Sequence, residues 1–69
     1  MGQGLRLGNE RRKMGLSQVD IARLITLMGT PLEQARLSQL ERGLKPHPDE
    51  IQALSGIFDL PPGKLFGEG

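Results

Sequence analysis

The residues best suited to chemistry lie in one stretch, EQARLSQLERG, which runs from Glu33 to Gly43. Leu37 and Leu40 are three residues apart, so they share one face of a helix, and Glu41 falls beside them on a helical wheel. The other side of that wheel carries small, amide-bearing and cationic side chains: Ala35, Ser38, Gln39 and Arg42.

A helix face of this composition has the chemistry needed in the major groove of DNA. A glutamine can bond two edge atoms of adenine at once, an alanine can contact the thymine methyl group, and an arginine can hold a phosphate or a guanine. The alternative is an ordinary solvated helix face, and the wheel alone leaves both interpretations open.

No other group of residues indicates catalysis or metal binding. His47 is the single histidine and has no second ligand in sight, and the chain has no cysteine. Asp49 and Glu50 could act as a carboxylate pair, but the start of a helix explains them better through the helix dipole. We therefore expect no enzyme, no metal, no cofactor and no small-molecule ligand.

The charge of the chain is divided unevenly along its 69 residues. Residues 1–45 hold eight Lys/Arg against four Asp/Glu, a net of +4, whereas residues 46–69 hold one against four, a net of −3. A polyanion would meet the first part, although a solvated surface of mixed charge is the alternative. No apolar run approaches the roughly 20 residues of a membrane span, and no secretory signal is visible. We expect a soluble, cytoplasmic protein without membrane contact.

The hydrophobic periodicity predicts an all-α fold of five short helices with tight joins. These helices would form one domain over residues 5–66. A flexible arm is expected at residues 1–4 and a tail at residues 67–69.

The first two helices are predicted from their apolar spacing and capping residues. Residues 5–14 would form the first helix, with Leu7 and Met14 on one face. Ser17 would cap the second helix, and Asp20 three residues later would complete a capping box. The spacing i, i+3, i+4, i+7 predicts that the buried stripe of this second helix is made by Ile21, Leu24, Ile25 and Met28.

Two starts are possible for the third helix. Thr30 and Glu33 fit a capping box with Pro31 in the first helical position. Alternatively, residues 30–32 form an ordered turn and the helix begins near Glu33. In either case the helix would end near Arg42.

The rest of the chain predicts two further helices. Asp49 and Glu50 suit the start of a fourth helix. The apolar residues of these last two helices are Ile51, Leu54, Ile57 and Phe58 in the fourth and Leu65 and Phe66 in the short fifth.

The order of these motifs resembles a known family. GLSQVDIARL, then a glycine-bearing turn, then RLSQLERG resembles the helix-turn-helix domain of the phage Cro and repressor family, the lambda-repressor-like fold. The resemblance extends over residues 5–66, because KPHPDEIQALSGIFDLPPGKLF is similar to the family's fourth and short fifth helices. The join between the second and third helices is longer here than the family's usual turn, as it is in members with a Gly-x-Pro insertion.

The resemblance implies roles for the residues at matching positions. The base-reading positions are Gln34, Ala35, Ser38 and Gln39, and the phosphate-binding positions are Ser17, Gln18, Arg36, Arg42 and Lys45. Gln18 would also brace the reading helix. Arg11 and Glu41 would form a structural pair that links the first helix to the third.

The resemblance implies sequence-specific binding of double-stranded DNA, by a transcriptional repressor or autoregulator that acts as a homodimer on a near-palindromic operator. The candidates for the dimer interface are Ile57, Phe58, Leu60, Leu65 and Phe66, with Leu60 or Phe66 near its centre. Alternatively, all five belong to the core. The alternative function is a protein–protein interaction module of the same fold that binds no DNA, which Glu33 and the low net charge favour.

Overall fold

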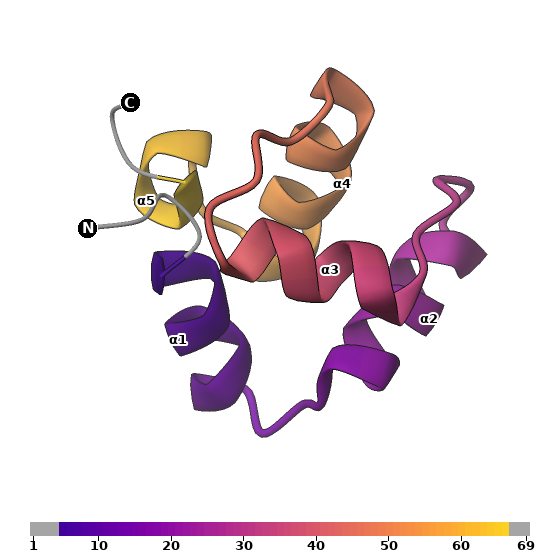
Figure 1. The fold of residues 1–69 in the computed structure, drawn as a ribbon, viewed down its shortest axis with the longest axis horizontal. Helices are drawn as coiled ribbons and strands as arrows, with labels where there is room; N and C mark the ends of the chain where they lie inside the picture. Colours follow the sequence, from indigo (N-terminus) through magenta and orange to yellow (C-terminus); the bar gives the residue numbers. More distant parts are fainter. Residues whose placement is uncertain (1–4, 67–69) are drawn as a thin grey trace.

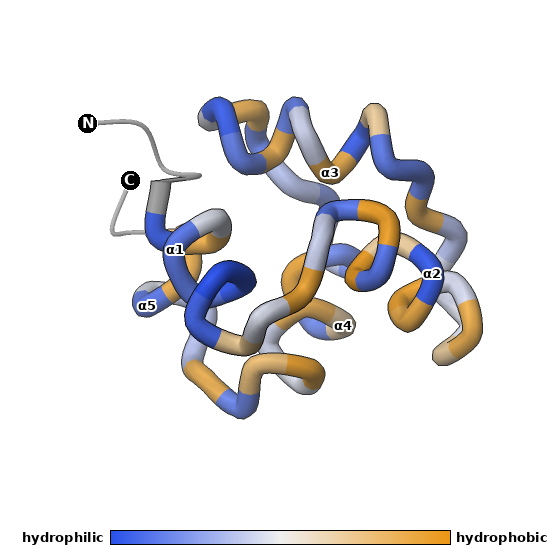
Figure 2. Tube along the Cα trace, turned by 90° about the horizontal axis from the view of Figure 1, so that it is seen from below, coloured by the Kyte–Doolittle hydropathy of each residue, from blue (hydrophilic) through white to orange (hydrophobic). Residues whose placement is uncertain are grey.

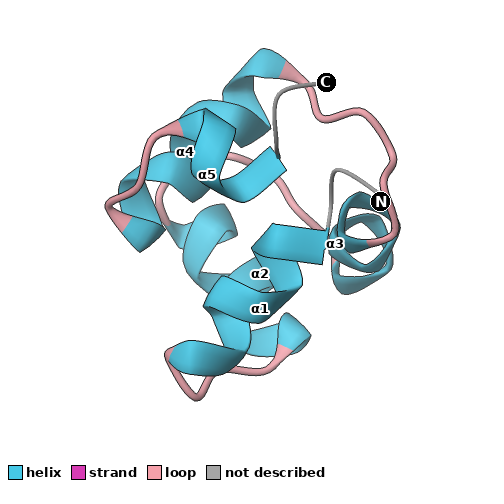
Figure 3. Ribbon diagram, turned by 90° about the vertical axis from the view of Figure 1, so that its left-hand side faces the viewer, coloured by secondary structure: helices cyan, strands magenta, loops and turns pink. Residues whose placement is uncertain are grey.

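The computed structural model describes residues 5–66, and this part of the chain contains five helices and no strands (Figures 1 and 3). The helices are α1 (Leu5–Lys13), α2 (Gln18–Leu27), α3 (Gln34–Glu41), α4 (Pro48–Phe58) and α5 (Pro62–Phe66). The predicted all-α fold of five short helices is thereby confirmed. The predicted arm at residues 1–4 and tail at residues 67–69 lie outside the described residues.

The third helix crosses the front of the molecule in Figure 1, with α1 and α2 below it and α4 above and behind it. The structure measures 29 × 24 × 22 Å along its principal axes. α3 contacts both α1 and α2, and α5 contacts α1, so the first and last helices meet. None of the helices in residues 5–66 has the length and apolar character that a membrane span requires.

The core draws one or more side chains from every helix and one from the turn before α3. Apolar and hydrophilic residues are interspersed along α2, α3 and α4, as Figure 2 shows, and every helix contributes buried apolar side chains to the core. The buried side chains of this core are Leu7, Ile21, Ile25, Leu32, Leu37, Leu40, Leu54, Leu65 and Phe66. Burying such aliphatic side chains is the main favourable contribution to folding in a domain of this size.

The start of α2 has the predicted capping box. The Ser17 hydroxyl oxygen accepts the backbone N–H of Asp20 at 3.1 Å, and the Asp20 carboxylate accepts the backbone N–H of Ser17 at 3.0 Å. Accepting the Ser17 backbone N–H holds the pKa of the Asp20 carboxyl below its usual range. The capping box sets where α2 begins, and therefore where Gln18 lies.

The segment between α2 and α3 is an ordered turn, so the second of the two possible helix starts is found. α3 begins after Glu33, whose backbone is extended. The Thr26 hydroxyl donates to the carbonyl oxygen of Leu32 at 3.0 Å and accepts the backbone N–H of Leu32 at 3.1 Å. The Leu32 side chain is buried in the core. These bonds fix the position from which α3 starts.

Two predicted apolar stripes are wrong in part. In α1, Leu7 is buried but Met14 is exposed, because the chain leaves the helix after Lys13. In α2, Ile21 and Ile25 are buried, but the third buried residue is Ala22, on the other side of the isoleucines from Leu24 and Met28. α2 is therefore rotated relative to the prediction, and Leu24 and Met28 face outward.

The C-terminal apolar residues belong largely to the core. Leu65 and Phe66 are buried, so they cannot line an interface between two copies, and the expectation that Phe66 lies near its centre is wrong. Ile57, Phe58 and Leu60 are half-buried and pack against the same core. The alternative, in which these side chains stabilise the domain itself, fits the structure better.

Candidate nucleic-acid interface

One side of α3 is open to solvent and carries the predicted base-reading residues. Gln34, Ala35 and Gln39 are exposed and Ser38 is half-buried. The opposite side is held by Leu37 and Leu40, which are both completely buried. The exposed side, which we call the reading face, comprises Gln34, Ala35, Ser38 and Gln39. Its side chains present amide, methyl and hydroxyl groups to the outside.

Gln18, the first residue of α2, bonds to both ends of α3. Its side-chain oxygen accepts an N–H from Gln34 at 2.8 Å, and its own amide N–H donates to the Glu41 carboxylate at 3.0 Å. Gln34 and Glu41 are the first and last residues of α3. The bracing role expected for Gln18 is therefore visible as two hydrogen bonds, and the orientation of α3 relative to α2 is fixed at two points.

The predicted pair of Arg11 and Glu41 is present and links α1 to α3. Arg11 donates from Nε to one Glu41 oxygen at 2.6 Å and from a terminal nitrogen to the other at 3.1 Å. Its second terminal nitrogen donates to the carbonyl oxygen of Leu16 at 2.9 Å. The Arg11 and Glu41 side chains are only 11% and 9% exposed. The carboxylate beside it raises the pKa of the Arg11 guanidinium above its ordinary value.

Gly8 lets α1 approach this carboxylate closely. The residue is buried, and a Cβ atom built on it would lie 3.2 Å from a Glu41 oxygen. A distance of 3.2 Å between a carbon and an oxygen is shorter than ordinary van der Waals contact. The position therefore favours a residue without a side chain.

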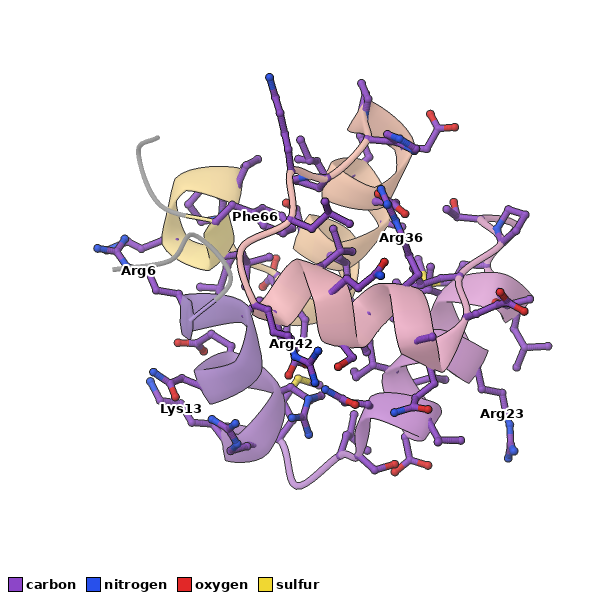
Figure 4. The ribbon with its side chains drawn as sticks, viewed as in Figure 1. Arg6, Lys13, Arg23, Arg36, Arg42 and Phe66 are labelled. Carbon is purple, nitrogen blue, oxygen red and sulfur yellow. The ribbon has the colours of Figure 1, made fainter. Side chains whose placement is uncertain are left out.

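Arg36 lies away from the reading face, in contrast to the phosphate-binding role expected for it. Figure 4 shows Arg36 on the α4 side of α3, whereas Arg42 lies at the end of α3 near α1. Arg36 donates to both Glu50 carboxylate oxygens at 2.8 Å, and Glu50 also accepts the backbone N–H of His47 at 2.8 Å. The bonds from Arg36 hold the pKa of the buried Glu50 carboxyl below its usual range. Arg36 thus joins α3 to α4.

Exposed cations follow α3 in the chain and also lie on α1, the helix that α3 contacts. Arg42 and Lys45 are exposed and follow α3 directly. On α1, Arg12 bonds to the Asn9 side chain at 3.2 Å and Lys13 to Glu10 at 3.2 Å, and both cations remain exposed. Ser17, which opens α2, is also exposed. Of the phosphate-binding residues predicted from the sequence, Ser17, Arg42 and Lys45 are exposed, whereas Gln18 and Arg36 are half-buried and their side chains are hydrogen-bonded to other helices.

The sequence did not reveal both partners in two of the bonds that hold this interface, although the resemblance implied that Gln18 braces the reading helix. One is the bond between Gln18 and Gln34, and the other is the pair of Arg36 and Glu50. Both join residues of different helices that no helical periodicity relates. The amide and charged side chains were visible as potential donors and acceptors, but their partners were not.

Comparisons of the chain with models of protein families, with curated proteins and with solved structures find no match. Within residues 5–66, no three His, Cys, Asp or Glu side chains gather where they could hold a metal ion. The features of this chain that bear on its function are the reading face and the bonds that orient it.

Proposed function

We propose that this chain binds double-stranded DNA in a sequence-specific manner, with α2 and α3 as a lambda-repressor-like helix-turn-helix. α3 enters the major groove, and α2 crosses the phosphate backbone. The observation that carries this proposal is the exposed row of Gln34, Ala35 and Gln39 on a helix whose two ends are both bonded to Gln18.

The bonds around α3 support this proposal because base recognition needs donors and acceptors in fixed positions. A side chain that is already oriented loses less conformational freedom when it binds. Gln34 is held by Gln18, and the end of α3 is held by Arg11 through Glu41. The α3 backbone is thus oriented before any DNA is bound.

The groups next to the reading face can bind the phosphates of a DNA backbone. Arg42 and Lys45 supply positive charge after α3, and the N-terminus of α2 supplies backbone N–H groups beside Ser17 and Gln18. These contacts set the register on the duplex, and the reading face specifies the bases.

We propose further that the protein is a transcriptional repressor or autoregulator. An eight-residue helix contacts few bases, so two copies on a near-palindromic operator give the selectivity that one lacks. Occupying a promoter in this way is sufficient for repression and requires no catalysis.

A gel-shift assay on random duplex DNA at several salt concentrations tests the proposal. The logarithm of the binding constant should fall linearly with the logarithm of salt concentration, with a slope of about −0.9 per phosphate contacted. Four to six contacts would give a slope of about −4 to −5. Arg42→Ala should make the slope shallower by about one unit. Duplex binding that does not respond to salt, or no binding at all, would exclude DNA reading.

A protein–protein interaction module with the same helices is the second candidate. The exposed Glu33 carboxylate favours it, because this negative charge adjoins the first residue of the reading face. Glu33→Gln separates the two candidates. The substitution should strengthen duplex binding if α3 meets DNA, because it removes a charge of the same sign as the phosphates. It should leave binding undetectable if the partner is a protein.

A further inference from the structure

The outer side of α2 carries an apolar stripe that nothing in residues 5–66 covers. Leu27 is 77% exposed, Met28 is 57% exposed and Leu24 is 40% exposed. The spacing of three and four residues puts these side chains next to one another on the helix surface. We call these three residues the α2 stripe. Contiguous exposed apolar side chains are typical of surfaces that bind a partner.

Within residues 5–66, the charged side chains without a hydrogen-bonded partner have opposite signs at the two ends of the α2 stripe, because the Asp20 carboxylate, one turn before Leu24, is engaged by the Ser17 backbone N–H. Arg23 lies at the N-terminal end, next to Leu24 and one turn before Leu27. At the other end Met28 lines a shallow pocket of about 240 Å³ together with Asp49 from the start of α4. Within residues 5–66, neither Arg23 nor Asp49 forms an ion pair. Both charges are exposed and available to a partner.

A surface with an apolar centre, a cation at one end and a carboxylate at the other is complementary to itself when it is turned by 180°. We propose that a second copy of this chain covers the α2 stripe, with the two α2 helices antiparallel about a two-fold axis. An axis between Leu24 and Leu27 places each Leu24 against the partner's Leu27. Each Arg23 then faces the partner's Asp49, so opposite charges meet at both ends of the contact.

The position of the α2 stripe on the molecule allows a dimer in which both α3 helices lie on the same face. Figure 4 has the view of Figure 1, and in it Arg23 points away from the right-hand edge of the molecule. Leu27 shares this side of α2, because it lies one turn beyond Arg23. A second copy is generated by a 180° rotation about an axis that is perpendicular to the plane of Figure 1 and passes through this right-hand edge. After this rotation the two α2 helices are antiparallel, and both α3 helices lie on the same face of the dimer.

This arrangement matches the spacing of DNA grooves, a step that rests on the proposed function. The longest dimension of the molecule, 29 Å, is horizontal in Figure 1. Two copies joined at the right-hand edge therefore hold their α3 helices roughly one molecular length apart. Successive major grooves on one face of DNA are about 34 Å apart, which is a similar distance.

Sedimentation equilibrium of the full chain is the first test, and it should show a monomer–dimer equilibrium. Leu27→Gln should raise the dissociation constant of the dimer about ten-fold or more, because it removes the most exposed apolar side chain from both sides of the contact. Val19→Gln is the matched control, since Val19 is an exposed apolar residue of the same helix outside the α2 stripe. It should leave the dissociation constant unchanged. Circular dichroism confirms that both variants are folded.

Mixing two charge variants shows whether the contact joins different chains. Arg23→Glu and Asp49→Arg should each weaken self-association, because each puts like charges opposite one another. An equimolar mixture should associate more tightly than either variant alone, because a mixed dimer has opposite charges at both contacts.

Three results would overturn the dimer: a wild-type chain that is monomeric at every concentration, a Leu27→Gln variant that associates like wild type, or a mixture no tighter than its components. In each case the α2 stripe is not the contact between two copies of this chain. Salt-dependent binding of the monomer to duplex DNA would persist, so failure of the dimer is distinguishable from failure of the proposed function.

Discussion

The Glu41 carboxylate is the shared acceptor on which the orientation of three helices depends. It accepts hydrogen bonds from Arg11 in α1 and from Gln18 in α2, and it belongs to α3. Because it is largely buried, its loss would leave the donors of both partners without an acceptor. Unpaired buried polar groups are costly, and an unpaired buried charge is more so.

Glu41→Ala should therefore lower the free energy of unfolding by about 3–5 kcal/mol, the usual cost of removing one partner of a buried ion pair. Thermal or urea denaturation measures this loss. Glu33→Ala is the control, because Glu33 is exposed and makes no side-chain capping bond. It should change stability by no more than about 0.5 kcal/mol. Similar losses for the two variants would show that the Glu41 bonds contribute little.

Gln39 and Lys45 should have different effects on DNA binding if the reading face recognises bases. Gln39→Ala should cost about 1–3 kcal/mol on the cognate operator and little on random duplex. Lys45→Ala should weaken binding to both DNAs alike, because a phosphate contact carries no sequence information. Binding titrations on an operator selected from a random pool measure both effects. Equal losses for Gln39→Ala on the two DNAs would contradict a base-reading role.

Among contacts between individual side chains, the sequence predicted only those that a helical wheel or the family resemblance could indicate. Glu41 falls on the inward side with Leu37 and Leu40, so a partner for it was expected, and Arg11 is that partner. The pair of Arg36 and Glu50 depends on how α4 packs against α3, which local periodicity does not encode. The phosphate role expected for Arg36 comes from the family resemblance, which does not indicate its partner in α4.

The close contact of α1 and α3 can be examined with two glycines, one in α1 and one in α4. Gly8 and Gly56 both lie inside helices, where alanine is favoured over glycine by up to about 1 kcal/mol. A Cβ atom at Gly56 would meet nothing within 4 Å, whereas one at Gly8 would press on the hydrogen-bonded Glu41 carboxylate. Gly56→Ala should raise the free energy of unfolding by about 0.5–1 kcal/mol. Gly8→Ala should give no gain, or a loss.

Chemical denaturation of the two variants compares these effects under one set of conditions. Equal stabilisation by Gly8→Ala and Gly56→Ala would show that Glu41 adjusts freely to a new methyl group.

The bounds of the helices were more predictable than the direction in which one of them faces. Ser17 and Asp20 marked the start of α2 because a capping box is a local arrangement. The buried side of α2 was not predictable from spacing, because Ile21 and Ile25 fit a stripe with Leu24 as well as one with Ala22. Packing against α3 and α4 decides between them, and it selects the small side chain.

For the molecule as a whole, Glu50 couples stability to pH. In the folded state the pKa of Glu50 lies below its usual value because Arg36, which stays charged throughout, bonds to the carboxylate. Its contribution to stability is therefore complete above the pKa of an unfolded glutamate, about 4.3, and is lost as the pH falls through the folded pKa. The free energy of unfolding should decrease as the pH is lowered below about 4.

Glu50→Gln should lower the free energy of unfolding at neutral pH by about 2 kcal/mol and should flatten its dependence on pH in the acid range. Denaturation curves recorded between neutral and acid pH measure both quantities. Glu33→Gln is the control, because Glu33 is exposed and makes no side-chain capping bond. A Glu50→Gln variant with the full acid sensitivity of wild type would assign that sensitivity to other carboxylates.

The bonds between Thr26 and Leu32 have a consequence for amide hydrogen exchange. Loop amides usually exchange rapidly, through small local openings. The Leu32 amide is bonded to the Thr26 hydroxyl beneath a buried side chain, so local opening would have to pull Leu32 out of the core. Its exchange with deuterium, followed by NMR, should be as slow as that of core amides in α2, whereas the exposed Lys45 amide should exchange quickly. The turn and the two helices it joins would then open as one cooperative unit.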